Sequence, residues 1–339
     1  MTPYERVHNR LLGKPVDKAP NLNILMAFAA RYAEVSFDKF CTDYKCLTYA
    51  NLKCNEYFGI DMLNTMSDAF RETYDFGAKI EFPFDSLPIS KEHFINAPTD
   101  LGKLKLFEPI NSTRILDRIH AIEAYKKEAG SHYSILGWVE GSFAEAADLH
   151  GVSEIMMDLY DEPEFIKEML EICCEQGIIC AKEQLKAGAD FIGIGDAAAS
   201  LTSPNIYREF ILPYEQKLIQ AIHREGGKVK LHICGNITHL MEDILKAGAD
   251  IIDIDSMVDL KTTINKAKGI SCINGNFDPV RVIYNGDPAS IREAVKNCVD
   301  NGDDTTFISA GCEIPRDTPP ENLKAVSDAL IEFSYNNNL

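Results

Sequence analysis

The chain has 339 residues, of which 45% are hydrophobic and 25% charged, as in a globular protein with a large core. Its formal net charge of −18 argues against nucleic acid or an anionic membrane surface as a partner, because both are negatively charged themselves. No apolar run approaches the roughly 20 residues that a membrane helix requires, and the stretch MTPYERVHNRLLGKP lacks the apolar centre of a signal peptide. We therefore expect a cytoplasmic protein whose ten cysteines are mostly free thiols.

Strand-like and helical segments alternate along most of the chain. Residues 1–19 have the pattern of an amino-terminal helical cap. Strand-like runs follow at residues 20–26, 59–65, 134–141, 191–196, 228–234, 251–255, 271–276 and 306–310. Helical patterns fill most of the gaps, and the clearest cover residues 163–187, 204–224, 237–246, 289–299 and 320–333. Residues 66–115 fit the alternation poorly, and 76–84 followed by the turn sequence DSLP predicts a strand pair within an insertion.

Strands that alternate with helices of ten or more residues predict parallel β-α units. The repeated sequence LKAGAD, at 185–190 and 245–250, supports this prediction, because each copy ends a helix with glycine and precedes an apolar strand. Eight strands of this kind favour a (β/α)8 TIM barrel, which we expect to form a single domain over residues 1–339 with the 66–115 insertion near its mouth. A doubly wound sheet is disfavoured, because no Gly-x-Gly-x-x-Gly follows an early strand.

A histidine and a cysteine stand at the end of the fifth predicted strand. His232 and Cys234 are two residues apart, so both side chains point to the same side of that strand. The active site of a (β/α)8 barrel is built at the carboxyl ends of its strands, and Cys312 follows the eighth strand at the same end. One imidazole and two thiolates with an open fourth position form a catalytic zinc set, so we predict that these three residues bind Zn²⁺. The alternative is that the cysteines pack as small hydrophobic residues.

Four further polar residues follow predicted strands at this end. Asp255 would supply a fourth or exchangeable metal ligand, or accept a hydrogen bond from His232, and Asp196 would orient a substrate; we predict catalytic roles for both. Asn276 and Arg31 are predicted substrate contacts, since an arginine there could bind an anionic group. Helix capping or surface ion pairing remains the alternative for the aspartates, and a surface position for the arginine.

Three motifs give the chain a resemblance to the uroporphyrinogen decarboxylase superfamily over essentially its full length. They are LGKPVD at 12–17, GD at 195–196 followed by SP at 203–204, and NGNFDP at 274–279. Within the superfamily, the chain resembles the corrinoid-dependent branch that includes methylcobamide:coenzyme M methyltransferases. The zinc motif of that branch, His-x-Cys with a distant Cys, is matched by His232, Cys234 and Cys312.

This resemblance implies a zinc-dependent methyltransferase that moves a methyl group between a methylcobamide and a thiol such as coenzyme M. Zinc would favour deprotonation of the thiol, which then attacks the methyl group. The chain has no corrinoid-binding Asp-x-His-x-x-Gly motif, so a partner corrinoid protein would supply the methylcobamide. The alternative is a decarboxylase acting on a tetrapyrrole. True decarboxylases lack the two thiols, however, and carry an arginine-rich segment where this chain has FAARY at 28–32, with Arg31 alone.

Overall fold

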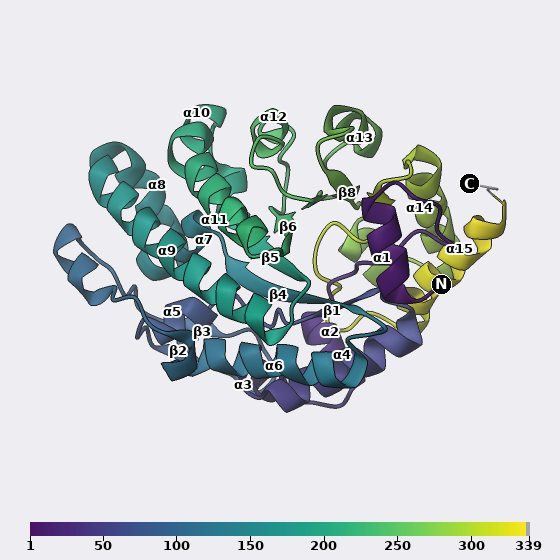
Figure 1. Ribbon diagram of the computed structural model, residues 1–339, viewed down its shortest axis with the longest axis horizontal. Helices are drawn as coiled ribbons and strands as arrows, with labels where there is room; N and C mark the ends of the chain where they lie inside the picture. The colour runs from purple at the N-terminus through teal and green to yellow at the C-terminus, as the bar shows by residue number, and fades with distance from the viewer. Residues whose placement is uncertain (337–339) are drawn as a thin grey trace.

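A computed structural model describes residues 1–336 of the chain (Figure 1). Its main sheet has seven parallel strands in the order β1-β4-β5-β6-β7-β8-β9. These strands are β1 (Met62–Asn64), β4 (Ser134–Glu140), β5 (Phe191–Gly195), β6 (Lys228–His232), β7 (Ile251–Asp253), β8 (Cys272–Asn274) and β9 (Thr306–Phe307). Their spatial order follows their sequence order, as the β-α alternation predicts.

Residues 20–22 fill the first position of the barrel, between β9 and β1, without forming a regular strand. Asn21 forms an isolated parallel bridge with Ile308, and the amide of Leu22 donates to the carbonyl of Ile308 at 3.3 Å. On the other side, the amide of Asp61 donates to the carbonyl of Asn21 at 2.8 Å. This segment therefore joins β9 to the start of β1, which confirms the predicted (β/α)8 barrel. The predicted strand over 20–26 is too long, because Met26 already begins a helix.

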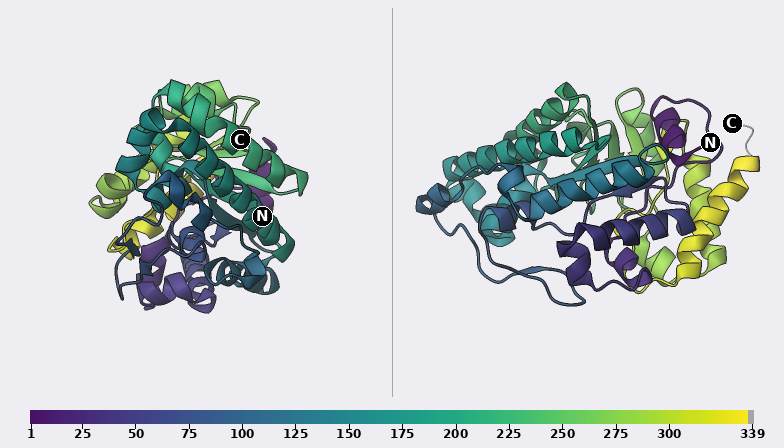
Figure 2. Two further views of the ribbon diagram at one scale, coloured as in Figure 1. Left: turned by 90° about the vertical axis from the view of Figure 1, so that its left-hand side faces the viewer. Right: turned by 60° about the horizontal axis from the view of Figure 1, so that its bottom comes forward.

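Helices cover the outer face of the sheet, and the views in Figure 2 show them around it. Along the chain they are α2 (Met26–Tyr32), α3 (Phe37–Thr42), α4 (Tyr44–Phe58), α6 (Arg114–Ala129), α7 (Ser142–His150), α8 (Val152–Asp161), α9 (Pro163–Ala187), α10 (Pro204–Ile206), α11 (Leu212–Arg224), α12 (Met241–Ile244), α13 (Leu260–Ala267), α14 (Pro288–Asn301) and α15 (Pro320–Asn336). Among the described residues, no helix is long and apolar enough to cross a bilayer.

Two of the five predicted helices differ from the prediction in detail. The helix over 204–224 is present, but a π-helical turn, Tyr207–Ile211, joins α10 to α11. The helix predicted over 237–246 is reduced to α12. The residues around it form tighter turns, in which amides bond to carbonyls three residues earlier, as from Leu240 to Ile237 at 2.9 Å.

Helix α1 (Pro3–Leu11) closes the amino-terminal end of the barrel, at the side of the molecule where both termini lie (Figure 1). It begins with a capping box, in which Thr2 and Glu5 each accept a hydrogen bond from the other's backbone amide, at 3.2 and 2.9 Å. Its buried Val7 joins the apolar core inside the barrel. That core consists of Val7, Leu22, Met62, Leu136, Trp138, Phe191, Ile251, Cys272 and Phe307. The predicted helical cap is therefore confirmed.

The insertion predicted at 66–115 contains short elements. They are α5 (Arg71–Asp75), the antiparallel pair β2 (Ile80–Glu81) and β3 (Ile89–Ser90), and the 3-10 turns Pro98–Lys103 and Pro109–Asn111. Asp85, between β2 and β3, forms an ion pair at 3.0 Å with Arg316, which follows β9. The insertion therefore reaches the carboxyl end of the barrel strands.

The single tryptophan requires a glycine opposite it inside the barrel. Gly193 on β5 pairs with Trp138 on β4, and a Cβ on Gly193 would stand 2.2 Å from the indole ring. Because the ring is fully buried and cannot move aside, we expect Gly193→Ala to destabilise the protein by about 1–3 kcal/mol, the usual cost of overpacking a core. Chemical denaturation would measure this. Gly102→Ala is the control, since a Cβ there meets nothing within 4 Å, and an equal loss for both variants would contradict the prediction.

Candidate metal centre

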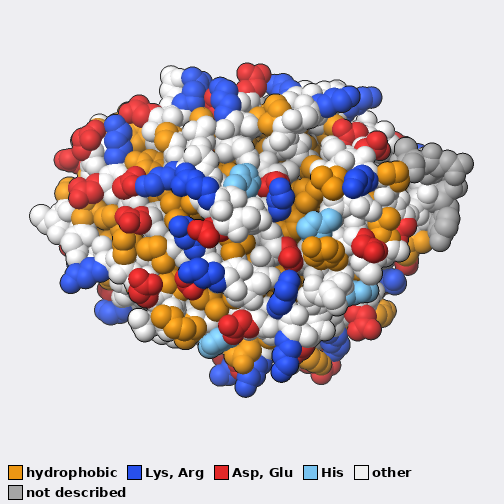
Figure 3. All heavy atoms as spheres, in the orientation of Figure 1, with side chains coloured by type: hydrophobic (Ala, Val, Ile, Leu, Met, Phe, Trp, Pro, Cys, Tyr) orange, Lys and Arg blue, Asp and Glu red, His pale blue; other side chains and the backbone are white. Residues whose placement is uncertain are grey.

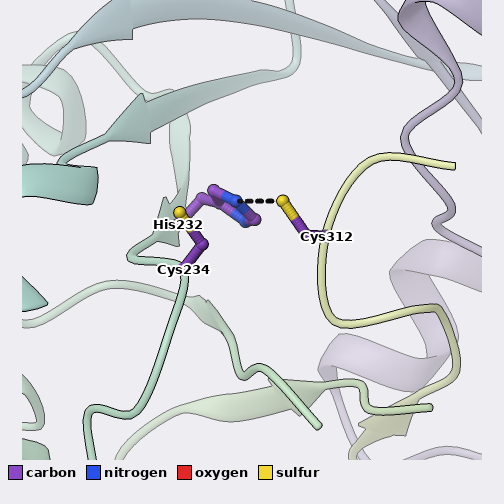
Figure 4. Close-up of side chains that lie close together, drawn as sticks. All are labelled: His232, Cys234 and Cys312. Atoms are coloured by element: carbon purple, nitrogen blue, oxygen red, sulfur yellow. Dashed lines mark hydrogen bonds between the residues drawn. The ribbon is translucent and has the colours of Figure 1, made fainter. Parts of the chain in front are cut away.

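Three potential metal ligands converge at the carboxyl end of the barrel. His232 ends β6, Cys234 follows it, and Cys312 comes from the loop after β9 on the opposite side (Figure 4). One nitrogen or sulfur atom of each lies within 4.8 Å of the others, and His232 Nε2 is 3.9 Å from Cys312 Sγ. Tetrahedral zinc, with bonds of about 2.3 Å to sulfur and 2.0 Å to nitrogen, holds its donors about 3.5–3.8 Å apart. The donor set and its spacing therefore fit a zinc ion.

Two glycines bring the ligands to this point. Gly235 has φ +91° and turns the chain directly after the second ligand. A Cβ on Gly311 would stand 2.6 Å from the Cα of Asp255, and because backbone cannot move aside cheaply, only glycine fits there. The loop after β9 therefore lies directly against the end of β7, and this contact carries Cys312 toward β6.

The buried carboxylate of Asp253 fixes the orientation of the His232 ring. His232 Nδ1 donates to Asp253 Oδ2 at 2.8 Å, Lys230 forms an ion pair with the same oxygen, and Asn274 Nδ2 donates to Oδ1 at 2.8 Å. All four side chains are buried. The bond at Nδ1 leaves Nε2 free to face Cys312, as in carboxylate-histidine-metal arrangements. The acceptor role that the sequence suggested for Asp255 thus falls to Asp253.

The ionisation of these groups follows from their contacts. Burial alone would raise the pKa of Asp253, but Lys230 and His232 outweigh it and lower that pKa to about 2. Burial alone would lower the pKa of His232, but its hydrogen bonds to Asp253 and Cys312 raise it to about 9. The hydrogen bond from Cys312 lowers the pKa of Cys234 to about 7, whereas the donating Cys312 has its pKa raised. Cys234 is therefore readily ionised, and a cysteine binds metal as its thiolate.

Asp255 contacts the turn after Cys234, whereas Asn276 lies farther out, where it contacts the loop after β7 and lines the groove between α13 and α14. Asp255 Oδ2 accepts from the amide of Gly235 at 3.1 Å, and its Oδ1 accepts from Ser256 Oγ at 3.0 Å. Asn276 Nδ2 donates to the carbonyls of Asp255 and Val258, at 3.0 and 2.6 Å. Both side chains therefore join the loops after β6, β7 and β8, and both stay predicted site residues.

Asp196 and Arg31 are not brought to the metal centre. Asp196 is fully buried, and its Oδ1 accepts from the amide of Ala144 at 2.9 Å, in the first turn of α7. Its side chain thus faces the helices, and burial raises its pKa to about 7. Arg31 is exposed and forms an ion pair with Asp317 at 2.9 Å. Helix capping for the aspartate and a surface position for the arginine are the alternatives that the sequence left open.

Glu140, the last residue of β4, lies near the ligands and was not among the predicted site residues. Its Oε1 accepts from the indole nitrogen of Trp138 at 2.8 Å, and the Trp138 ring lies 6.2 Å from the His232 ring, centroid to centroid. The rule that located His232, a polar residue at the carboxyl end of a barrel strand, applies equally to Glu140.

The model of the family described as uroporphyrinogen decarboxylase (URO-D) matches residues 2–333. The chain belongs to this family. One curated relative is the methylcobamide:CoM methyltransferase MtbA of Methanosarcina acetivorans, which is 28% identical over 98% of this chain and 99% of its own length. The uroporphyrinogen decarboxylase of Geotalea daltonii is 26% identical over 91% and 93%. The solved structure of a methyltransferase from Methanosarcina mazei has a TM-score of 0.90 at 24% identity, over 98% and 99% of the two chains, and so shares the fold.

Proposed function

We propose that this protein is a zinc-dependent methyltransferase that moves a methyl group between a methylcobamide and a thiol acceptor such as coenzyme M. The observation that carries the proposal is the convergence of His232, Cys234 and Cys312 on one point at the mouth of the barrel. Similarity to methylcobamide:CoM methyltransferases over nearly the whole chain supports it. A decarboxylase has no evident use for two converging thiols.

Zinc bound by these residues would take the acceptor thiol at its fourth position and favour loss of the thiol proton, since a free thiol with a pKa of about 8.5 is mostly protonated at neutral pH. The protein's own residues prepare that position. Asp253 holds the His232 ring with Nε2 toward the site. With zinc bound, Cys234 and Cys312 would contribute two anionic sulfurs, which would suit thiol alkylation better than water activation. Asp255, beside the ligands, is the candidate exchangeable ligand.

The methylcobamide would arrive on a separate corrinoid protein, because the chain lacks the Asp-x-His-x-x-Gly motif. Asn276 remains a candidate contact for the substrate or the corrinoid, whereas the fully buried Asp196 would act on the site only by holding the start of α7 in place. On the face seen in Figure 3, acidic and basic side chains are interspersed, with no continuous basic stripe of the kind that nucleic acid would favour. The proposed binding partners of this chain are therefore a corrinoid protein and a small thiol.

The alternative, decarboxylation of a tetrapyrrole, has less support. A porphyrinogen carries several carboxylates, which require several cations. Here the segment after the first barrel position keeps Arg31 alone, and this arginine is exposed and paired with Asp317. This alternative has its own prediction, which is metal-independent release of CO₂.

The function is tested with protein purified without chelator. We expect about one zinc per chain and thiol-dependent demethylation of methylcobalamin, followed by its visible spectrum. Removal of zinc with a chelator should abolish the reaction, and readdition should restore it. Tetrahydrofolate serves as a non-thiol control. Protein without zinc, or decarboxylation of uroporphyrinogen that a chelator leaves unchanged, would contradict the proposal.

A further inference from the structure

We propose that the thiol acceptor carries a neutral or positively charged end group, and that Glu140 receives this group. The inference rests on the proposed methyl transfer and narrows its substrate class. It departs from coenzyme M, whose end group is an anionic sulfonate. Three features of the barrel mouth support it: the direction of the Glu140 carboxyl, the acidic surroundings of the ligands, and the engagement of the neighbouring cations.

The Glu140 carboxyl leans toward the metal ligands. In the sheet register, Glu140 on β4 pairs with Gly195 on β5, and Gly195 pairs with His232 on β6. Glu140 Oε2 lies 3.0 Å from the position that a Cβ on Gly195 would take, so the carboxyl occupies the space left by that glycine. Neighbouring strands are about 4.8 Å apart, which puts the histidine's strand within reach of this side chain.

One oxygen of this carboxyl is held and the other is free. Oε1 accepts from Trp138 Nε1 at 2.8 Å, whereas Oε2 has no hydrogen-bond partner within the described part of the chain. The side chain as a whole is only 7% exposed, but Oε2 is not among the fully buried atoms that lack a partner in the described chain, so it is open to solvent at the barrel mouth. Because no group of the protein occupies this acceptor, a donor group on a ligand in the barrel mouth could form a hydrogen bond with it.

The charges next to the ligands are acidic. Asp255 accepts from the amide of Gly235, the residue after Cys234, and the Glu140 carboxyl fills the space beside Gly195, whose strand partner is His232, so two carboxyls lie near the centre. The oxygens of Asp255 accept from Gly235 N and Ser256 Oγ, and neither donor carries a charge. Burial raises the pKa of Glu140 well above its ordinary value, and a cationic ligand group would favour its ionised form, whereas an anionic group would oppose it.

The cations at this end of the barrel are engaged elsewhere. Lys230 is 1% exposed and is paired with Asp253 beneath the ligands. Arg31 and Arg316 are each paired with an aspartate at the surface. Arg281 lines a groove on the outside of the barrel, between α13 and α14. Arg118, whose charge acts on Glu140, is fully buried, donates to the Trp138 carbonyl and pairs with Glu72. None of these five lysine and arginine side chains is free to pair with an anionic end group beside the ligands.

Three thiols of equal chain length test whether the site prefers an anionic, a neutral or a cationic end group. 2-Mercaptoethanesulfonate (coenzyme M), 2-mercaptoethanol and cysteamine carry a sulfonate, a hydroxyl and an ammonium group on the same two-carbon chain. With methylcobalamin as donor, we expect kcat/KM to be lowest for the sulfonate. The ammonium thiol should exceed it by roughly tenfold or more, as one nearby charge near a protein surface can produce. Binding to cobalt-substituted protein, followed by the sulfur-to-cobalt absorption band, should give the same order without catalysis.

Glu140→Gln tests the residue itself. Comparing the ammonium-to-sulfonate ratio between variant and wild type cancels the intrinsic reactivity of the thiols, and we expect Glu140→Gln to reduce that ratio roughly tenfold. Glu145→Gln is the matched control: Glu145 is equally buried but accepts from Thr73 among the helices, so the ratio should stay unchanged. Preference for the sulfonate, or a ratio that Glu140→Gln leaves unchanged, would overturn the inference while methyl transfer stands. Failure of all three thiols would instead overturn the proposed function, and this inference with it.

Discussion

Replacing Cys312 with alanine should remove bound zinc and lower thiol-dependent demethylation of methylcobalamin by more than about 100-fold, because even the loss of an outer hydrogen-bond partner costs about 10–100-fold. The variant keeps His232 and Cys234, which sit on one strand end and leave two of the four tetrahedral positions to be filled by water and substrate. Cys312 is the ligand that comes from across the barrel, so its loss opens the site on that side. Zinc content and the rate of methyl transfer are measured on the same preparation.

The control for this variant is Cys46→Ala. Cys46 is half-buried like Cys312, but it lies on α4 and its nearest polar partner is Asp43. It should retain both zinc and activity, which excludes a general effect of removing a thiol. Full activity and stoichiometric zinc in Cys312→Ala would show that the metal, if present, is held by other residues, and the proposed function would lose its main support.

The barrel was predictable because its signals repeat. Each β-α unit pairs an apolar strand with an amphipathic helix, and the two LKAGAD copies mark the same junction twice. The lengths of the strands were less predictable. β7, β8 and β9 end earlier than their apolar runs, because the chain leaves the regular ladder to form the loops that carry Asp255, Asn276 and Cys312. The first barrel position was predicted as a strand over residues 20–26, but only backbone bonds of Asn21 and Leu22 hold it in the barrel.

Only some of the site residues could be predicted from the pattern of a single sequence. The spacing of His232 and Cys234 fixes a shared direction, and strand-end placement adds Cys312. A barrel strand is buried on both faces, however, so its sequence does not say which face is inside. On β5 the inner face carries Gly193 and Gly195, which leave room for the Trp138 ring, and this parity turns Asp196 outward to the helices.

The sequence pattern also could not decide whether Asp253 or Asp255 accepts the hydrogen bond from His232. Both face the same side of one strand, so the pattern treats them alike. The two aspartates differ in their position along the strand. Asp253 pairs in register with His232 and is buried beside Lys230, whereas Asp255 lies beyond the last paired residue of β7. The lysine was the available signal, since a buried cation on the neighbouring strand requires a carboxylate within reach of its side chain, and Asp253 is nearer to Lys230 along the paired strands than Asp255 is.

The charge of Asp253 should therefore be important for both the fold and the metal. Asp253→Asn leaves the Lys230 ammonium, 1% exposed, without its counter-ion, and breaking a buried pair in this way costs about 3–5 kcal/mol. The same change weakens the acceptor of the His232 Nδ1 proton, so zinc affinity should fall about 10–100-fold. Denaturant unfolding measures the first effect, and competition with a zinc chelator measures the second.

A second substitution separates these two effects. In Lys230→Met/Asp253→Asn the unpaired ammonium is gone, so most of the lost stability should return, because a buried ion pair is often replaceable by neutral residues of similar size. Zinc affinity should stay low, since the amide still replaces the carboxylate that His232 requires. Glu92→Gln, in the exposed pair with Lys79, should change neither quantity. If the double variant regained wild-type zinc affinity, Asp253 would act on the metal only through folding; if it stayed unstable, the buried ammonium would not be the cause. The expected split, with stability recovered and affinity lost, would show that the carboxylate itself orients the ligand.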